Sequence, residues 1–224
     1  MLYRGLRARI LTFVTKRGAV FFFVSRHNMS SLAGVIIMRD GRALLHGLPP
    51  PATTKTMTMI LEVKGKRPSW GRACYIAGNA TLAGDIVMGD DCSVWFSAVL
   101  RADVDAIRIG DRVNIQDGAC IHESGGAPTI LEDDVSVGHL ANVHGCVVRR
   151  GALVGMGATV LDHAEVGEGA IVAANALVTQ GTKIGPGEIW AGCPARFVKK
   201  AKPGQAEEYA RHYVEAKAWY LANE

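Results

Sequence analysis

The chain has 224 residues, of which 49% are hydrophobic, and this suits one domain with a substantial core together with extensions. Its net charge of +4 is unevenly spread: residues 1–58 hold nine Arg or Lys and one acid, a net of +8. Subtraction leaves 16 basic and 20 acidic residues, a net of −4, for the remainder, so we expect no nucleic-acid partner. The apolar run Ala19–Val24 has six residues and is too short to span a membrane.

Residues 1–58 differ in character from the rest of the chain. They are rich in arginine and poor in acids, as mitochondrial presequences are, and the alternative is an upstream extension joined by a loose linker at Pro49–Thr58. On either interpretation we expect this segment to be poorly ordered. The five cysteines are odd in number and show no paired spacing, which favours a reducing compartment. We therefore expect a cytoplasmic protein, or a mitochondrial matrix protein if residues 1–58 are a presequence.

A six-residue repeat runs through the chain beyond this segment. Every sixth residue over one long stretch is large and apolar, namely Val148, Val154, Val160, Val166, Val172, Val178, Ile184 and Trp190. A helix of 3.6 residues per turn cannot keep that period on one side, whereas a short strand followed by a turn can. Three such units close a triangular coil of 18 residues with the large side chains inward. We expect an all-β solenoid of about six or seven coils, a parallel β-helix that is left-handed by resemblance to other hexapeptide repeats.

The repeat and its end divide the chain into three parts. The β-helix is expected over residues 59–202, with its coils beginning near residue 74. After Pro203-Gly204 the pattern changes to the spacing of an α-helix of about 18 residues, with a stripe of Tyr209, Tyr213 and Tyr220. We expect residues 203–224 to pack this helix on the prism.

The register of the repeat places several polar side chains on the outside of the prism. The period is interrupted three times, and counting through the interruptions puts Leu100, Ile121 and Val143 on one face of successive coils. The next residue in each case is polar, so one outer face stacks Arg101, His122 and His144 about 4.8 Å apart. His139 and Asp117 belong to the preceding face, one coil from each other.

Three histidines divided over two faces cannot easily converge within one chain. Two chains side by side can combine His122 and His144 of one with His139 of the other, and three prisms around a threefold axis would form three such sites. Three imidazoles with an open position are the ligand set of catalytic zinc, although iron(II) or cobalt would also bind there. We therefore expect a homotrimer with metal sites between its subunits.

These residues resemble the gamma-class carbonic anhydrase family, and more closely its compact bacterial branch. The resemblance covers residues 60–222, and the motifs that carry it are Arg101-Ala-Asp103, Asn114-Ile-Gln116-Asp117-Gly118, His122, His139, His144 and Gly192-Cys193-Pro194-Ala195. The family implies a trimer in which His122, His139 and His144 bind the metal.

The resemblance also implies roles for residues around the metal. It implies that Arg101 and Asp117 pair across the subunit boundary, with Asp103 and Asn114 in the same network. It further implies that Gln116 hydrogen-bonds the metal-bound water and that Tyr213 lies near the site.

The resemblance predicts a metal-dependent carbonic anhydrase, a lyase in which metal-bound hydroxide attacks carbon dioxide to give bicarbonate. One alternative is a metal-assisted acyl-CoA thioesterase or acyltransferase-like enzyme, because relatives with the same fold act on such thioesters. Another is a non-catalytic assembly subunit, which the intact histidine triad disfavours.

The sequence departs from the well-studied archaeal branch at the groups that would carry protons. Val104 stands in place of a glutamate, the acidic loop is shortened to residues 123–128, and Glu215 replaces an asparagine. Glu123 and Glu215 are the nearest acids by sequence, and neither matches the family's position. We therefore expect proton transfer to limit turnover in weak buffer and added imidazole to accelerate it.

Overall fold

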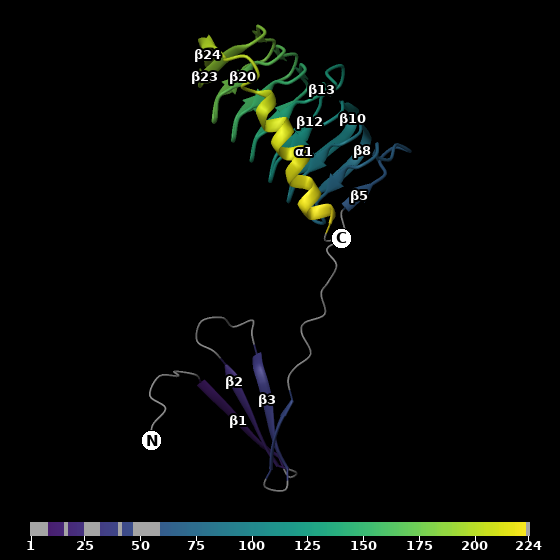
Figure 1. Ribbon diagram of the computed structural model, residues 1–224. Helices are drawn as coiled ribbons and strands as arrows, with labels where there is room; N and C mark the ends of the chain where they lie inside the picture. Colours follow the sequence, from purple (N-terminus) through teal and green to yellow (C-terminus); the bar gives the residue numbers. More distant parts are fainter. Residues whose placement is uncertain (1–8, 16–17, 25–31, 40–41, 47–58, 223–224) are drawn as a thin grey trace. The chain divides into compact units, whose positions relative to one another are not determined.

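Figure 1 shows a computed structural model that describes residues 9–15, 18–24, 32–39, 42–46 and 59–222. The chain divides into two compact units, Met1–Lys55 and Thr56–Glu224. The linker expected over residues 49–58 lies outside the described residues. The expected division at residue 58, and a disordered or targeting segment before it, stay predictions.

The first unit contains a four-stranded antiparallel sheet in the order β1-β2-β3-β4. Its strands are β1 (Arg9–Thr15), β2 (Gly18–Val24), β3 (Leu32–Arg39) and β4 (Arg42–His46). The apolar run 19–24 lies within β2.

The second unit is a parallel β-solenoid of about 7 turns with one C-terminal helix, so the predicted left-handed β-helix fold is confirmed (Figure 1). The strands of one sheet are β7 (Tyr75–Ile76), β9 (Ser93–Val94), β11 (Asn114–Ile115), β14 (Ser136–Val137), β17 (Leu153–Val154), β20 (Ile171–Val172), β23 (Glu188–Gly192) and β24 (Ala195–Lys200). All of its pairings are parallel except that of β23 with β24.

The second sheet of this unit has twelve strands. They are β5 (Met59–Leu61), β6 (Ser69–Trp70), β8 (Thr81–Met88), β10 (Val99–Ile109), β12 (Cys120–His122), β13 (Thr129–Leu131), β15 (Asn142–His144), β16 (Val147–Val148), β18 (Thr159–Val160), β19 (Glu165–Val166), β21 (Leu177–Val178) and β22 (Lys183–Ile184). The long strand β10 pairs with β12 through its first residues and with β13 through its last. It therefore links two faces of the prism.

The interior of the prism is formed by the residues of the six-residue period. Leu100, Ile121, Val143 and Val160 pair in sequence across successive coils and are at most 1% exposed. Burying a side chain of this size stabilises a fold by about 1.5–3 kcal/mol, so the stacked column is a main source of stability. The register shift between Ala102 and Ile107 corresponds to the first interruption of the repeat.

The single helix of this unit, α1 (Glu207–Leu221), has 15 residues and lies along the face formed by β7, β9, β11 and β14 (Figure 1). Tyr213 and Tyr220 pack edge-on against Trp95, with ring centroids 5.3 and 4.9 Å apart. The buried ammonium of Lys217 donates hydrogen bonds to Ala73 O and to Asp91. The helix is thereby fastened to the prism at its second half. Within the described ranges, no helix is long and apolar enough to cross a membrane.

Candidate metal centre

His122 and His144 stack on one outer face, as the register predicted. They are paired residues of β12 and β15, and their ring centroids lie 5.1 Å apart. Nδ1 of His122 lies 2.6 Å from the carbonyl oxygen of Arg101 on the preceding coil. A carbonyl only accepts hydrogen bonds, so Nδ1 of His122 carries the proton and its Nε2 keeps a free lone pair.

His144 is oriented by a carboxylate that the sequence analysis did not identify. Nδ1 of His144 lies 2.5 Å from Oδ1 of Asp162, and the Ser124 hydroxyl donates to the other oxygen of Asp162 at 3.1 Å. The hydrogen bond from His144 lowers the pKa of Asp162, so this carboxyl is ionised at neutral pH. Asp162 lies on the next coil, two residues after Val160, which pairs with Val143 directly before His144. This nearness in the register was the signal that could have found it.

His139 lies on the neighbouring face in a similar arrangement. Its Nδ1 is 2.8 Å from Oδ2 of Asp117, and its Nε2 is 3.5 Å from the hydroxyl of Tyr213 on α1. Burial raises the pKa of Tyr213, and the charge of Asp117 adds to that rise, so the phenol is neutral near pH 7. Tyr213 therefore lies beside His139, where the resemblance had placed it near the site.

The three histidines share a property that suits metal binding. Each Nδ1 faces an oxygen acceptor, which selects the tautomer with the lone pair on Nε2. Metal-binding histidines almost always show this arrangement, with the second nitrogen held by a carboxylate or a carbonyl. The donor set therefore fits a divalent metal.

A buried amide network lies behind His139. Gln116 donates from Nε2 to Asn114 at 3.0 Å and accepts from the backbone N–H of His139 at 3.2 Å. Asn114 donates in turn to the Ser136 hydroxyl at 2.7 Å, and all three polar side chains are buried. The second N–H of the Gln116 amide has no partner in this network. The amide is therefore fixed in orientation and keeps one N–H that can donate a further hydrogen bond.

Arg101 and Asp103 form an ion pair within the chain. Nη1 of Arg101 lies 2.7 Å from each carboxylate oxygen of Asp103, and this hydrogen bonding lowers the pKa of Asp103. The pairing of Arg101 with Asp117 was expected between two chains, and it stays a prediction.

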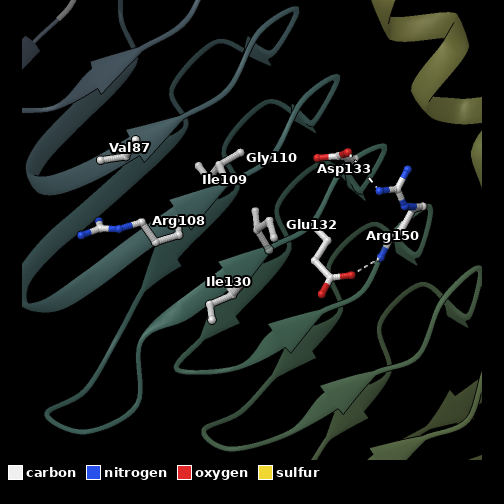
Figure 2. A pocket seen from close by; sticks show the side chains of 9 residues that line it. Val87, Arg108, Ile109, Gly110, Ile130, Glu132, Asp133 and Arg150 are labelled. Carbon is white, nitrogen blue, oxygen red and sulfur yellow. Dashed lines mark hydrogen bonds and ion pairs between the residues drawn. The ribbon is translucent and has the colours of Figure 1, made fainter.

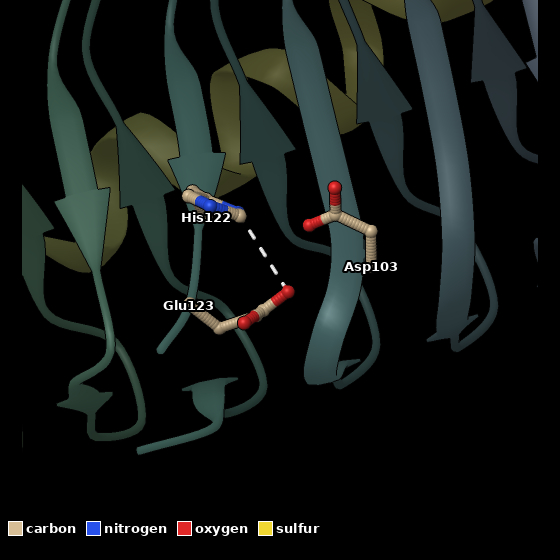
Figure 3. A group of neighbouring side chains, drawn as sticks. All are labelled: Asp103, His122 and Glu123. Carbon is tan, nitrogen blue, oxygen red and sulfur yellow. Dashed lines mark ion pairs between the residues drawn. The ribbon is translucent and has the colours of Figure 1, made fainter. Parts of the chain in front are cut away.

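Glu123 is buried beside His122, although the sequence suggested it as a possible proton carrier (Figure 3). It is 1% exposed, and its Oε1 accepts the backbone N–H of Val104 at 3.0 Å. Among the described residues, Asp103, His122 and Glu123 are the group whose potential ligand atoms lie within 4.8 Å of one another. That group contains neither His139 nor His144, so the three predicted ligands do not converge within one chain.

Two cavities differ in their relation to the histidines. One of about 400 Å³ is lined by Gln116, His139, apolar residues of β17 and β20, and Tyr209, His212 and Tyr213 of α1. Another of about 330 Å³ lies over β8, β10 and β13 and contains none of the predicted site residues (Figure 2). Its Arg150 is paired with Asp133 at 3.2 Å. The first cavity therefore belongs to the candidate site.

Comparison with known proteins identifies the family. The model for the bacterial transferase hexapeptide (six repeats) matches residues 145–180. The carbonic anhydrase of Geobacillus kaustophilus is 44% identical over 167 residues, which cover 73% of this chain and 92% of that protein. The mitochondrial gamma carbonic anhydrase 2 of Arabidopsis thaliana is 43% identical over 147 residues, covering 63% of this chain and 53% of the plant protein.

A solved structure of a relative has the same fold. A Bacillus cereus protein described as a putative acetyltransferase superposes with a TM-score of 0.73 at 40% identity, covering 75% of this chain and 99% of that one. The chain belongs to the gamma-class carbonic anhydrase family, a family of lyases, as its sequence predicted. Its carbonic anhydrase relatives imply a metal cofactor, which the three oriented histidines fit.

Proposed function

We propose that this protein hydrates carbon dioxide to bicarbonate at a metal site assembled between the subunits of a homotrimer. His122 and His144 of one subunit and His139 of its neighbour would hold the metal. The observation that carries the proposal is that all three imidazoles have Nδ1 engaged and Nε2 left for a ligand.

A divalent metal on three imidazoles with an open position lowers the pKa of a bound water to about 7 and so supplies a nucleophile at neutral pH. Zinc is the metal we propose, and iron(II) or cobalt would suit the same ligands. Arg101 O, Asp117 and Asp162 fix the imidazole rings, because each accepts the Nδ1 proton of one histidine.

The remaining residues act on the substrate and the reacting water. The spare N–H of Gln116 would hold an oxygen of the water or the substrate, and the neutral Tyr213 hydroxyl would donate to an oxygen of the product. The apolar walls of the 400 Å³ cavity, formed by Leu153, Ile171 and Val172, suit a nonpolar gas. Asn114 acts through Gln116 by fixing the amide orientation.

Exposed apolar side chains beside the histidines support the trimer. Leu140, directly after His139, is 68% exposed, and Met156, which lines the cavity, is 57% exposed. Large apolar side chains next to a site commonly mark an interaction surface. In the proposed trimer, Arg101 of one subunit would pair with Asp117 of its neighbour at the same boundary.

A cytoplasmic location is also part of the proposal. It is supported by the five cysteine thiols, all of which are free.

The test is stopped-flow measurement of carbon dioxide hydration by metal-replete protein prepared anaerobically. We expect hydration that is lost in His122→Ala and retained in Arg72→Ala, whose side chain is on the surface at the first coil. The same protein is assayed against a panel of acyl-CoA thioesters, because a cavity of about 400 Å³ exceeds what carbon dioxide needs. Thioester cleavage without hydration, with metal bound, would refute the proposal in favour of an acyl-CoA enzyme.

A further inference from the structure

Hydration of carbon dioxide releases one proton per turnover, and the acids suggested by the sequence are poorly placed to remove it. Glu123 has no exposed side-chain surface and is bound to Val104 N, so it does not reach solvent. Val104, at the place of the family's glutamate, is 61% exposed and carries no titratable group. The proton needs another acceptor near the histidines.

The cavity beside His139 contains such a group. His212 lines it from α1, is exposed to solvent, and contacts Tyr213 edge-on with ring centroids 5.5 Å apart. Tyr213 in turn lies 3.5 Å from Nε2 of His139, the atom that would bind the metal. His212 thus lies along a cavity that leads from the predicted metal site to the surface.

The other titratable groups of this cavity do not suit the task. His139 would be held by the metal. Burial raises the pKa of Tyr213, so its phenol is already protonated at neutral pH and cannot take up the released proton. Tyr209 is a phenol one turn away on the same helix. Histidine is the residue type whose ordinary pKa lies near neutrality, where a carrier both accepts and releases a proton readily.

We propose that His212 accepts the proton that carbon dioxide hydration releases and passes it to solvent. This rests on the proposed function. The water oxygen keeps the electron pair of its broken O–H bond and forms the new C–O bond. The proton passes through the cavity to a ring nitrogen of His212, and the imidazolium then gives it to a buffer base.

Carboxylates flank His212 on its own helix. On α1, Glu208 and Glu215 lie one turn before and after it, at positions that share a helix face with it. From the prism, the titratable group that lines this cavity is His139, whose Nδ1 lies 2.8 Å from Oδ2 of Asp117.

The test compares His212→Ala with Arg211→Ala, an exposed neighbour on the same turn that does not line the cavity. In weak buffer we expect kcat of His212→Ala to fall about tenfold or more, with kcat/KM unchanged, because only proton removal is slowed. Added imidazole should restore kcat of this variant. It should change the wild type little, in contrast to the acceleration expected from the sequence alone, because His212 already carries the proton. Metal content and the thermal unfolding midpoint should match those of the wild type.

A second readout does not depend on activity. Diethyl pyrocarbonate should modify the His212 ring of the metal-loaded protein, as detected by mass spectrometry, because a carrier that lines the cavity and is exposed to solvent is accessible to the reagent. If the wild type hydrates carbon dioxide and the kcat of His212→Ala in weak buffer equals that of the wild type, the role of His212 is overturned while the proposed function stands. Absence of hydration in every metal-loaded protein would overturn the proposed function instead.

Discussion

Replacing Asp162 by alanine removes the acceptor that orients His144. The hydrogen bond between His144 Nδ1 and Asp162 is 2.5 Å long and involves an ionised carboxylate, but both side chains are about one third exposed. Removing such a partner of a metal-binding histidine lowers metal affinity by about 10–100-fold, or about 1.4–2.7 kcal/mol. Solvent exposure favours the lower half of this range.

The assay is competition for Co²⁺ or Zn²⁺ between the protein and a chelator of known affinity. Asp162→Asn should lose less, because its carbonyl still accepts from Nδ1, and Ser124→Ala should lose least, since it touches only the second oxygen. Asp134→Ala, which breaks an ion pair with Arg112, is the matched control and should leave metal affinity unchanged. Equal affinities for Asp162→Ala and the wild type would refute the orienting role.

Four further outcomes are expected. Light scattering should give a trimer, and a monomer with full metal occupancy would refute the shared site. His139→Ala and His144→Ala should each lose metal by elemental analysis yet keep the wild-type circular dichroism, because outward side chains contribute little to the interior; unfolded variants would contradict this. Ion pairs lower the pKa values of Asp85 and Glu165 in the folded protein. The stability that these two carboxylates contribute is therefore full above about pH 5 and is lost as the pH falls through the lowered pKa values. The thermal midpoint should be flat from about pH 8 to 5 and fall below about pH 4, and no fall by about pH 3 would contradict this. Lys217→Met should cost about 1–3 kcal/mol in urea unfolding by removing two hydrogen bonds of α1, and an unchanged midpoint would show that the helix is held by its aromatic contacts.

The sequence was sufficient to predict the faces of the prism, because the six-residue period determines which way each side chain points. Counting through the interruptions placed His122 opposite His144 and Asp117 beside His139, as the structure has them. Asp162 was missed although the register leads close to it, because Val160, two residues before it, pairs with Val143, directly before His144.

The positions of Glu123 and His212 depend on how a loop packs and how the C-terminal helix docks. The six-residue period of the sequence does not determine either. Glu123 follows an outward-facing histidine, yet the short loop after it turns the carboxylate inward against Val104 N. His212 reaches the cavity only because α1 docks along the face of β9, β11 and β14. Its position relative to His139, 73 residues earlier, could not be read from spacing.

The central claim is that one site takes ligands from two chains, and subunit mixing tests it most directly. His139→Ala and His144→Ala are each expected to be inactive alone, because every site lacks one ligand. When they are unfolded together in equal amounts and reassembled, each mixed trimer should contain one intact site, formed by His122 and His144 of one variant and His139 of the other. With random assembly, metal content and hydration rate should return to about a quarter of the wild-type values. Mixed trimers, verified by mass spectrometry, that recover neither metal nor activity would show that the ligands come from one chain and would contradict the account.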